Sequence, residues 1–276
     1  SRPLPAPRPA RPILVTGSGA LAREIFQACR LRGLSVVAPG RSLDVRDADA
    51  VSLALEELAP WAVFNAAGVR DGRSAERDPA GTARLHTDAP SVLALECELR
   101  RIRLATLSSS LVLPSGGAHD ETVPRAPRTV LGAAQAEGEQ RILERYPGAL
   151  VLRCGFVVGL GRTDDFLAAG LALLRDRGQW SVPAYASVIV AGLLAQAGLD
   201  LLEDGETGIW HLAHRRPLLE LARTAARHAG LDVAGVVAET TCGARLVSIR
   251  GQILPSCGPA LRALVRAGVE APAPAS

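Results

Sequence analysis

The sequence predicts an α/β fold, in which a Rossmann-like, doubly wound parallel sheet carries a small, mainly helical C-terminal lobe. Three observations predict it. Short apolar runs typical of buried strands alternate with helical segments through the first half of the chain. The first run, residues 13–16, is followed at once by a glycine turn and the start of a helix. After Gly155 the alternation loosens and helical patterns dominate.

The first strand and its turn carry the dinucleotide-binding fingerprint G-x-G-x-x-A. Gly17 permits a sharp turn, Gly19 lets backbone approach a pyrophosphate because it has no Cβ, and Ala22 lets the helix pack close to the sheet. The helix N-terminus offers free N–H groups and a positive dipole end to phosphates. A turn that only connects strand and helix would have the same sequence. The residues expected to bind the dinucleotide are Gly17, Ser18, Gly19, Ala20 and Leu21.

Length and composition limit the possible classes of protein. The chain has 276 residues, enough for one large α/β domain or a domain with a smaller lobe. With 48% hydrophobic residues it has material for a full core, and a net charge of only +3 does not favour a nucleic-acid partner. There is no lysine, so all 31 basic residues are arginines.

The five cysteines are scattered without a C-x-x-C pair, which is typical of reduced thiols rather than a disulfide framework or a zinc site. No N-terminal apolar run resembles a signal peptide, and no segment reaches membrane-spanning length. We therefore expect a cytoplasmic protein with no metal, no nucleic-acid partner and no membrane partner.

The remaining elements are expected in order along the chain. Strands are expected at 35–38, 62–64, 103–107 and 150–153, with helices at 47–58, 78–99 and 131–146 and a Pro- and Gly-rich loop at 111–128. The lobe would contain helices at 166–177, 188–202, 218–229 and 259–267, with short strands near 180 and 209–212. The expected divisions are a disordered arm at 1–12, an NAD(P)-binding domain at 13–160, an interleaved substrate-binding lobe at 161–269 and a tail at 270–276.

Seven segments share their order with those of one family. They are VTGSGALARE, GRSLDVRDADAV, FNAAG, LSSSLVLPSGG, HDETVPRAPRTVLG, LRCGFVVG and TGIWHLAH. Together, over about residues 11–229, they resemble the extended short-chain dehydrogenase/reductase superfamily. Within it they look most like dTDP-4-dehydrorhamnose reductases and related nucleotide-sugar 4-ketoreductases. The resemblance implies an NAD(P) cofactor and a nucleotide-sugar substrate.

The resemblance also implies roles for individual residues. Arg41 stands where NADP-preferring members place a basic residue for the 2′-phosphate, although a solvated surface arginine is an equal alternative. No Asp or Glu ends the second strand to hold the ribose of NAD, so NADP is expected over NAD. Asp44 and Val45 would lie near the adenine, and Ser109 would hold the substrate carbonyl. The segment under the nicotinamide ribose would be Asn65, Ala66, Ala67 and Gly68.

The family's catalytic motif Tyr-x-x-x-Lys is changed in this chain. In the family the Tyr protonates the ketone, and the Lys lowers the pKa of the Tyr and binds the ribose. Here Leu131 stands at the Tyr position and Gln135 at the Lys position, within a frame that is otherwise kept. Leu has no proton to give and Gln carries no charge. Because a general acid contributes about 10²–10⁴ in rate, ordinary reductase activity is expected to be lost.

Other candidate groups are weaker. His119 could supply a substitute acid or base, although a structural role in its loop is the stronger alternative. His211 and His214 lack a third ligand, so a metal site is not expected. Cys154 is expected to be a buried apolar thiol rather than a nucleophile.

Three functions remain open at this point. The first is a repurposed enzyme of nucleotide-sugar or secondary metabolism, which uses the old cleft for non-standard or non-redox chemistry. The second is a non-catalytic nucleotide-binding regulatory or partner subunit, and the third is a slow NADPH-dependent 4-ketoreductase that relies on Ser109. The expected partners are a small-molecule substrate and either a second copy or a regulatory protein. The dinucleotide would be NADP, or NAD, or absent.

Overall fold

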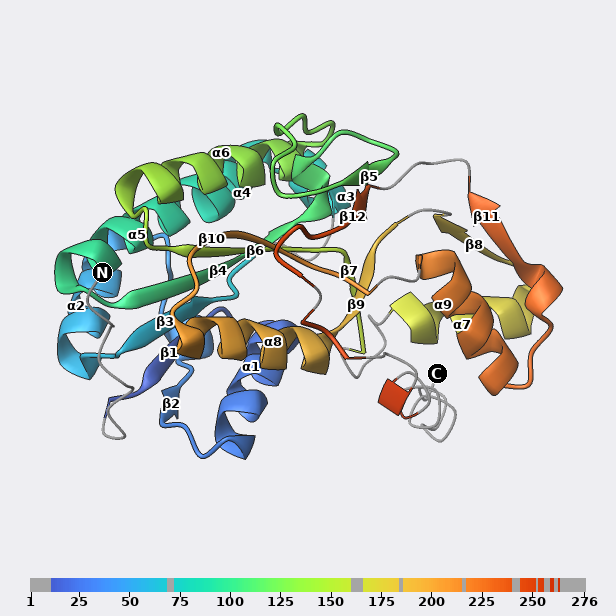
Figure 1. The fold of residues 1–276 in the computed structure, drawn as a ribbon, viewed down its shortest axis with the longest axis horizontal. Coiled ribbons are helices and arrows are strands. Elements are labelled where there is room, and N and C mark those ends of the chain that lie inside the picture. The colour runs from blue at the N-terminus through green and yellow to red at the C-terminus, as the bar shows by residue number, and fades with distance from the viewer. Residues whose placement is uncertain are drawn as a thin grey trace.

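A six-stranded parallel sheet forms the centre of the computed structural model (Figure 1). The structure describes residues 11–68, 72–159, 166–183, 186–214, 217–239, 244–251, 253–255, 259–260 and 263. The strands are β1 (Ile13–Thr16), β2 (Val36–Val37), β3 (Ala62–Asn65), β4 (Arg103–Ser109), β6 (Leu150–Cys154) and β10 (Gly208–Leu212), in the spatial order β10-β6-β4-β3-β1-β2. The chain moves outward from β1 to β2 and then returns to β3 on the other side of β1. Ligands of open α/β sheets bind outside the carboxyl ends at such a reversal.

Helices cover both faces of the sheet (Figure 1). One face packs against α1 (Ala20–Leu31) and α8 (Ala191–Asp204), and the other against α2 (Ala48–Leu58), α5 (Ala89–Arg100) and α6 (Val130–Arg145). In β1, Ile13 and Val15 join the first of these cores, and Leu14 joins the second. A strand buried on both faces needs an uninterrupted apolar run, which is why this strand was predictable.

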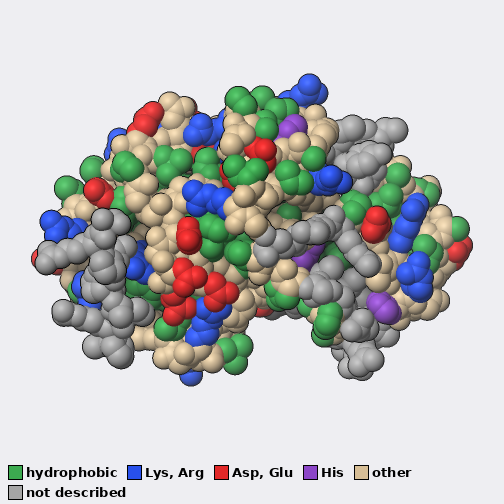
Figure 2. All heavy atoms as spheres, in the orientation of Figure 1, with side chains coloured by type: hydrophobic (Ala, Val, Ile, Leu, Met, Phe, Trp, Pro, Cys, Tyr) green, Lys and Arg blue, Asp and Glu red, His purple; other side chains and the backbone are tan. Residues whose placement is uncertain are grey.

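Arg32, which caps α1, fixes that helix to α8. Its guanidinium donates to the side-chain oxygen of Gln196 at 2.7 Å and forms ion pairs of 2.7 Å with both Asp200 and Glu203. Acidic side chains gather over α8 on this face of the molecule (Figure 2). The two helices are therefore held together by charge as well as by apolar packing.

A smaller lobe lies beside the carboxyl ends of the strands (Figure 1). Its core joins α7 (Phe166–Arg177) and α9 (Leu218–His228) to the parallel pair β8 (Trp180–Pro183) and β11 (Val236–Glu239). A second parallel pair, β7 (Phe156–Val158) with β9 (Val188–Val190), continues from β6 toward the lobe. A third, β5 (Ala118–His119) with β12 (Arg245–Leu246), brings the chain back to the loop after β4.

The helical stretch expected at 78–99 is confirmed, although it is not one continuous α-helix. It consists of α4 (Pro79–Ala83), a π-helical turn (Arg84–Asp88) and α5, and α3 (Gly72–Arg77) precedes it. Pro90, in the first turn of α5, has no N–H to donate to the carbonyl group of His86. A widened π turn accommodates the lost hydrogen bond.

Three expectations were wrong in part. Residues 188–190 form β9 rather than helix, because these β-branched side chains are buried beside β7. The strand near 209–212 belongs to the main sheet as β10, since its side chains fill the cores on both sheet faces. The expected loop at 111–128 contains the short strand β5.

The expected tail at 270–276 lies outside the described residues, as do the arm except for Arg11 and Pro12 and most of the helix expected at 259–267. The division into domains stays a prediction. Within the described ranges, no helix is both long and apolar enough to cross a membrane.

Candidate functional site

The glycine turn lies at the carboxyl end of β1, where the sequence places it. Gly17 has a φ of +94°, and a Cβ on it would lie 2.7 Å from the carbonyl oxygen of Ala66. Only glycine fits this position without strain, because backbone fills the space and the conformation is left-handed. Gly19 is the N-cap of α1, and a Cβ there would meet no atom of the described residues within 4 Å. The start of α1 therefore faces open space, with N–H groups available to an anion.

Asn65, at the carboxyl end of β3, connects this strand to β1 and β4. Its Oδ1 accepts from Thr16 Oγ1 at 2.6 Å and from the N–H of Ala67 at 3.2 Å, and its Nδ2 donates to Thr106 Oγ1 at 3.1 Å. These bonds fix the segment that follows β3 against β1 and β4. Gly68 continues the segment and would place a Cβ 3.0 Å from the ring of His86.

The loop after β2 carries the other predicted cofactor residues. Arg41 is exposed and makes no ion pair with any residue that the structure describes, whereas Val45 is buried. Asp44 is engaged by a residue that sequence reasoning missed, Arg46, which forms an ion pair of 2.7 Å with it. The hydrogen bonds from Arg46 lower the pKa of Asp44 to about 2. Oppositely charged residues two positions apart in a loop were the available signal.

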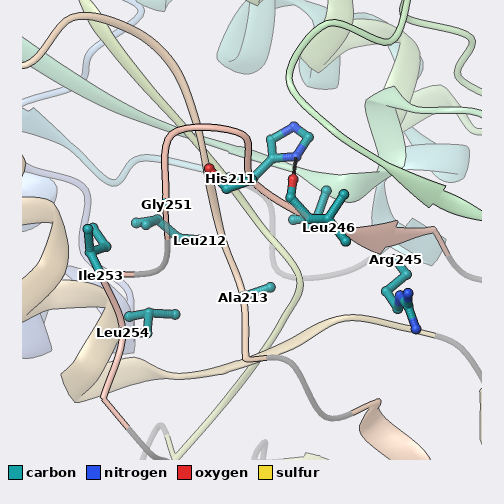
Figure 3. A pocket seen from close by; sticks show the side chains of 10 residues that line it. His211, Leu212, Ala213, Arg245, Leu246, Gly251, Ile253 and Leu254 are labelled. Atoms are coloured by element: carbon teal, nitrogen blue, oxygen red, sulfur yellow. Dashed lines mark hydrogen bonds between the residues drawn. The ribbon is translucent and has the colours of Figure 1, made fainter.

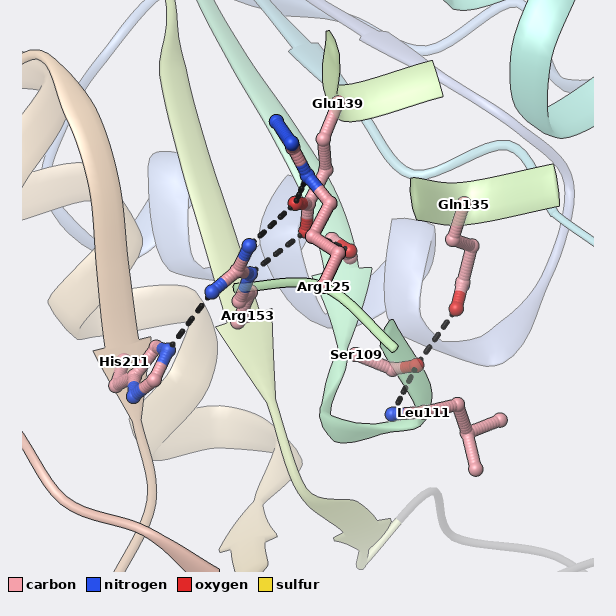
Figure 4. A network of polar contacts seen from close by, with 8 residues as sticks. Ser109, Leu111, Arg125, Gln135, Glu139, Arg153 and His211 are labelled. Atoms are coloured by element: carbon pink, nitrogen blue, oxygen red, sulfur yellow. Dashed lines mark hydrogen bonds and ion pairs between the residues drawn. The ribbon is translucent and has the colours of Figure 1, made fainter. Parts of the chain in front are cut away.

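Ser109 and Gln135 lie in direct contact (Figure 4). Ser109 Oγ donates to Gln135 Oε1 at 2.6 Å and accepts the N–H of Leu111 at 3.2 Å. Leu131, one helical turn before Gln135 on α6, is 8% exposed. The structure thus brings the serine at the end of β4 into contact with Gln135 on α6.

Sequence reasoning missed a buried polar network on the same helix face (Figure 4). Glu139 accepts from Arg153 Nε at 2.8 Å and Nη2 at 2.6 Å, from Ser108 Oγ at 2.6 Å and from Arg125 Nε at 3.0 Å. The side chains of Arg153 and Glu139 are 1% and 2% exposed. An arginine inside the apolar strand LVLRC was the signal, because a buried charge needs a partner.

The loop triplet His119-Asp120-Glu121 is held by structural contacts. Nε2 of His119 lies 2.6 Å from the carbonyl oxygen of Gly116, and Asp120 accepts from Thr122. Glu121 accepts from Ser248 Oγ at 2.6 Å, from the N–H of Ile249 and from the N–H of His211. Glu121 therefore fastens the returning chain to β10.

The two late histidines are neutral, structural groups. His211 Nε2 lies 3.4 Å from Arg153 Nη1, which is a donor only, so Nδ1 carries the proton and donates to the carbonyl oxygen of Val247 at 2.8 Å. Burial lowers the pKa of both His211 and His214. No cluster of three or more potential metal ligands occurs in the part of the chain that the structure describes.

Cys154 ends β6 as a protonated thiol. Its Sγ donates to the carbonyl oxygen of Ser108 at 3.2 Å, and burial raises its pKa to about 12. A thiol with so high a pKa is a poor nucleophile at neutral pH.

Two cavities border these groups. A hollow of about 10 Å³, room for about one water molecule, brings together Asn65, Ala67 and Gln135 with Ser108 and Glu139. A larger cavity of about 400 Å³ lies between the end of β10 and residues 245–248, Gly251, Ile253 and Leu254 (Figure 3). His211, on its lining, donates to the carbonyl oxygen of Val247. None of the predicted cofactor or catalytic residues lines this larger cavity.

The chain matches a known family model and several known proteins. The family model described as the RmlD substrate binding domain matches residues 11–246. A dTDP-4-dehydrorhamnose reductase of Streptomyces griseus is 32% identical over 219 residues, which cover 75% of this chain and 71% of that protein. The methionine adenosyltransferase 2 subunit beta of Pongo abelii is 26% identical over 184 residues, 63% of this chain and 54% of that subunit.

Solved structures share the fold. A dTDP-4-dehydrorhamnose reductase from Clostridium acetobutylicum superposes with a TM-score of 0.83 at 19% identity, covering 92% of this chain and 98% of that one. The corresponding protein from Bacillus anthracis, in complex with NADP, gives a TM-score of 0.81 at 18% identity with the same coverage.

Proposed function

Because this chain belongs to the RmlD substrate binding domain family, we propose that it binds NADP and a nucleotide-sugar substrate but does not use the reductase's Tyr/Lys pair. We propose that it is an enzyme whose reaction has changed from that of the reductases. The reaction would take place in the cleft where the family binds its substrate, either by non-redox chemistry or with another proton donor. The proposal has two parts, dinucleotide binding and a changed acid–base site, and each has its own support.

The contact between Ser109 and Gln135 carries the proposal for the acid–base site. Three residues of α6 follow each other at helical spacing toward β4: Leu131, Gln135 and Glu139. Leu131 has no ionisable group. Gln135 is neutral and accepts a hydrogen bond from Ser109 at 2.6 Å. Glu139 forms an ion pair with Arg153. No group on this face can protonate a ketone oxygen and then be stabilised by a neighbouring cation.

Support for dinucleotide binding comes from the turn after β1. The backbone of Gly17 lies close to that of Ala66, and no described residue caps the N-terminus of α1 with its side chain. Arg41 is exposed and forms no ion pair within the described ranges. A family relative has been solved with NADP. NADPH when bound would supply a hydride to a reducible carbonyl and leave as NADP⁺, and Gly17, Gly19 and Arg41 would hold the phosphates of the dinucleotide.

Restoring the pair tests the changed site. The variant Leu131→Tyr/Gln135→Lys should oxidise NADPH with a 4-keto nucleotide sugar, whereas the wild type should do so at least about 10²-fold more slowly. The measurement is NADPH absorbance on both proteins side by side. Ser109→Ala in the restored background should remove the gained activity. Wild-type turnover in the ordinary enzyme range of about 1–10³ s⁻¹ would contradict the proposal.

A second candidate function is a non-catalytic partner subunit. The relative named as a methionine adenosyltransferase subunit favours it, as do exposed leucines on the neighbouring helices α2 and α5, namely Leu53, Leu95 and Leu99. In this case the restored variant would remain inactive although the protein still bound NADP. Light scattering on Leu95→Glu/Leu99→Glu would then report the lost self-association or partner contact.

A further inference from the structure

The loop between β2 and α2 lies where an adenosine ribose would be recognised. β2 pairs with β1 in parallel, so the loop leaves the sheet on the same edge as the glycine turn. In dinucleotide-binding sheets the discrimination between NAD and NADP is made at the end of the second strand. The charge of this loop therefore bears directly on which dinucleotide it accepts.

Four ionisable side chains leave this loop: Arg41, Asp44, Arg46 and Asp47. Asp47 is the N-cap of α2, where it accepts the N–H groups of Asp49 and Ala50 and faces the positive end of the helix. Arg41 is exposed without an ion-pair partner among the described residues. The charge presented to a ligand then depends on whether Asp44 is neutralised.

Arg46 neutralises Asp44 through both carboxylate oxygens. Its Nε lies 2.9 Å from Oδ1 and its Nη2 lies 2.7 Å from Oδ2, while its backbone N–H also donates to Oδ1 at 3.0 Å. Both side chains are 49% exposed, so the pair is an accessible part of the loop surface. With two of its donor nitrogens on Asp44, the guanidinium is directed at the carboxylate rather than at solvent.

We infer that Arg46 makes this loop selective for NADP by neutralising Asp44, which would otherwise repel the 2′-phosphate and cancel the charge of Arg41. Arg46 is a positioning residue in this role, since it acts through Asp44. The inference rests on the proposed dinucleotide binding and names the residue that sets its selectivity.

The quantity to measure is the ratio of the Kd values for NADP⁺ and NAD⁺, obtained by titration calorimetry on the full chain. This ratio cancels contacts to the adenine and the nicotinamide, which both dinucleotides share. Arg46→Ala should weaken NADP⁺ about fivefold relative to NAD⁺ at low salt, as expected when an unpaired carboxylate repels a nearby phosphate through water. High salt should reduce the difference.

The double variant Asp44→Asn/Arg46→Ala separates neutralisation from direct contact. If Arg46 acts through Asp44, removing the carboxylate as well restores the ratio to within about twofold of wild type. A double variant that stays as weak for NADP⁺ as Arg46→Ala would overturn the inference, because Arg46 would then contact the phosphate itself.

Arg141→Ala is the matched control, since Arg141 is also an exposed arginine in ion pairs, with Glu137 and Asp88. It changes the net charge equally and should leave the ratio unchanged. If Arg46→Ala behaves like Arg141→Ala while wild type binds NADP⁺, the inference alone fails. If wild type binds neither dinucleotide, the proposed function fails with it.

Discussion

At the scale of single residues, the most consequential pair is Arg153 and Glu139. Both are almost completely buried and joined at 2.6 Å, and Ser108 and Arg125 complete the hydrogen bonding of the carboxylate. Such a pair gains little over apolar packing, but the loss of one partner leaves an uncompensated buried charge. Ser108 contacts Glu139 and the next residue, Ser109, contacts Gln135, so the ion pair also holds this face of α6 at the candidate site.

Glu139→Ala should lower the free energy of unfolding by about 3–5 kcal/mol, because the Arg153 guanidinium would remain buried without its counter-charge. Urea unfolding followed by circular dichroism measures it. Glu137→Ala, which removes an exposed partner of Arg141, should cost at most about 1 kcal/mol. Equal losses in the two variants would show that the burial of the first pair has no energetic consequence.

At the scale of elements, the contact between α6 and the π-helical turn depends on two residues far apart in sequence. Pro90 leaves the carbonyl oxygen of His86 without its usual helical donor. A Cβ on Gly138 would lie 2.0 Å from that oxygen, so α6 approaches the turn at a distance that only glycine permits. This close approach sets the distance between α6 and the π-helical turn, and with it the positions of Leu131 and Gln135.

Gly138→Ala should therefore destabilise the protein by about 1–3 kcal/mol despite the better helix propensity of alanine. Gly192→Ala in α8 is the matched control, since the nearest atom to its Cβ would be 3.9 Å away. That variant should be neutral or up to about 1 kcal/mol more stable. Thermal unfolding of the two variants gives the comparison, and a stabilised Gly138→Ala would contradict the close approach.

At the scale of the whole molecule, burial of histidines makes stability depend on pH. His86, His211 and His214 all have a pKa lowered by burial, and that of His86 falls to about 4 from an ordinary value near 6.5. The unfolded chain binds these protons more readily than the folded one below pH about 6.5. Stability is therefore complete above that pH and falls as the pH drops toward 4.

For His86 the expected loss is about 1.4 kcal/mol per pH unit between pH about 6.5 and about 4. Urea unfolding at a series of pH values measures the slope. His86→Gln should flatten the slope in this window, because the proton uptake that separates the folded from the unfolded chain is removed. An unchanged slope in His86→Gln would show that His86 is protonated in the folded protein.

The sequence by itself determined the parallel sheet and the glycine turn at its first strand. Apolar runs, helix patterns and glycine turns are local properties, so residues 13–16, the turn at Gly17 and the start of the helix near Asp47 were predictable. It also raised the hypothesis that Leu131 and Gln135 replace the catalytic pair, which stays a proposal. The assignments of the cofactor residues likewise stay predictions.

Only the tertiary structure decided which distant groups meet. β10 belongs to the main sheet because its side chains pack into the cores on both faces of that sheet. The local sequence pattern does not show which sheet a strand joins. The partner of Arg153, the contact between Ser109 and Gln135, and the approach of Gly138 to His86 each join segments separated by many residues. Local sequence specifies backbone conformation, but contacts between side chains depend on how whole elements pack, because burial and charge are properties of the assembled core.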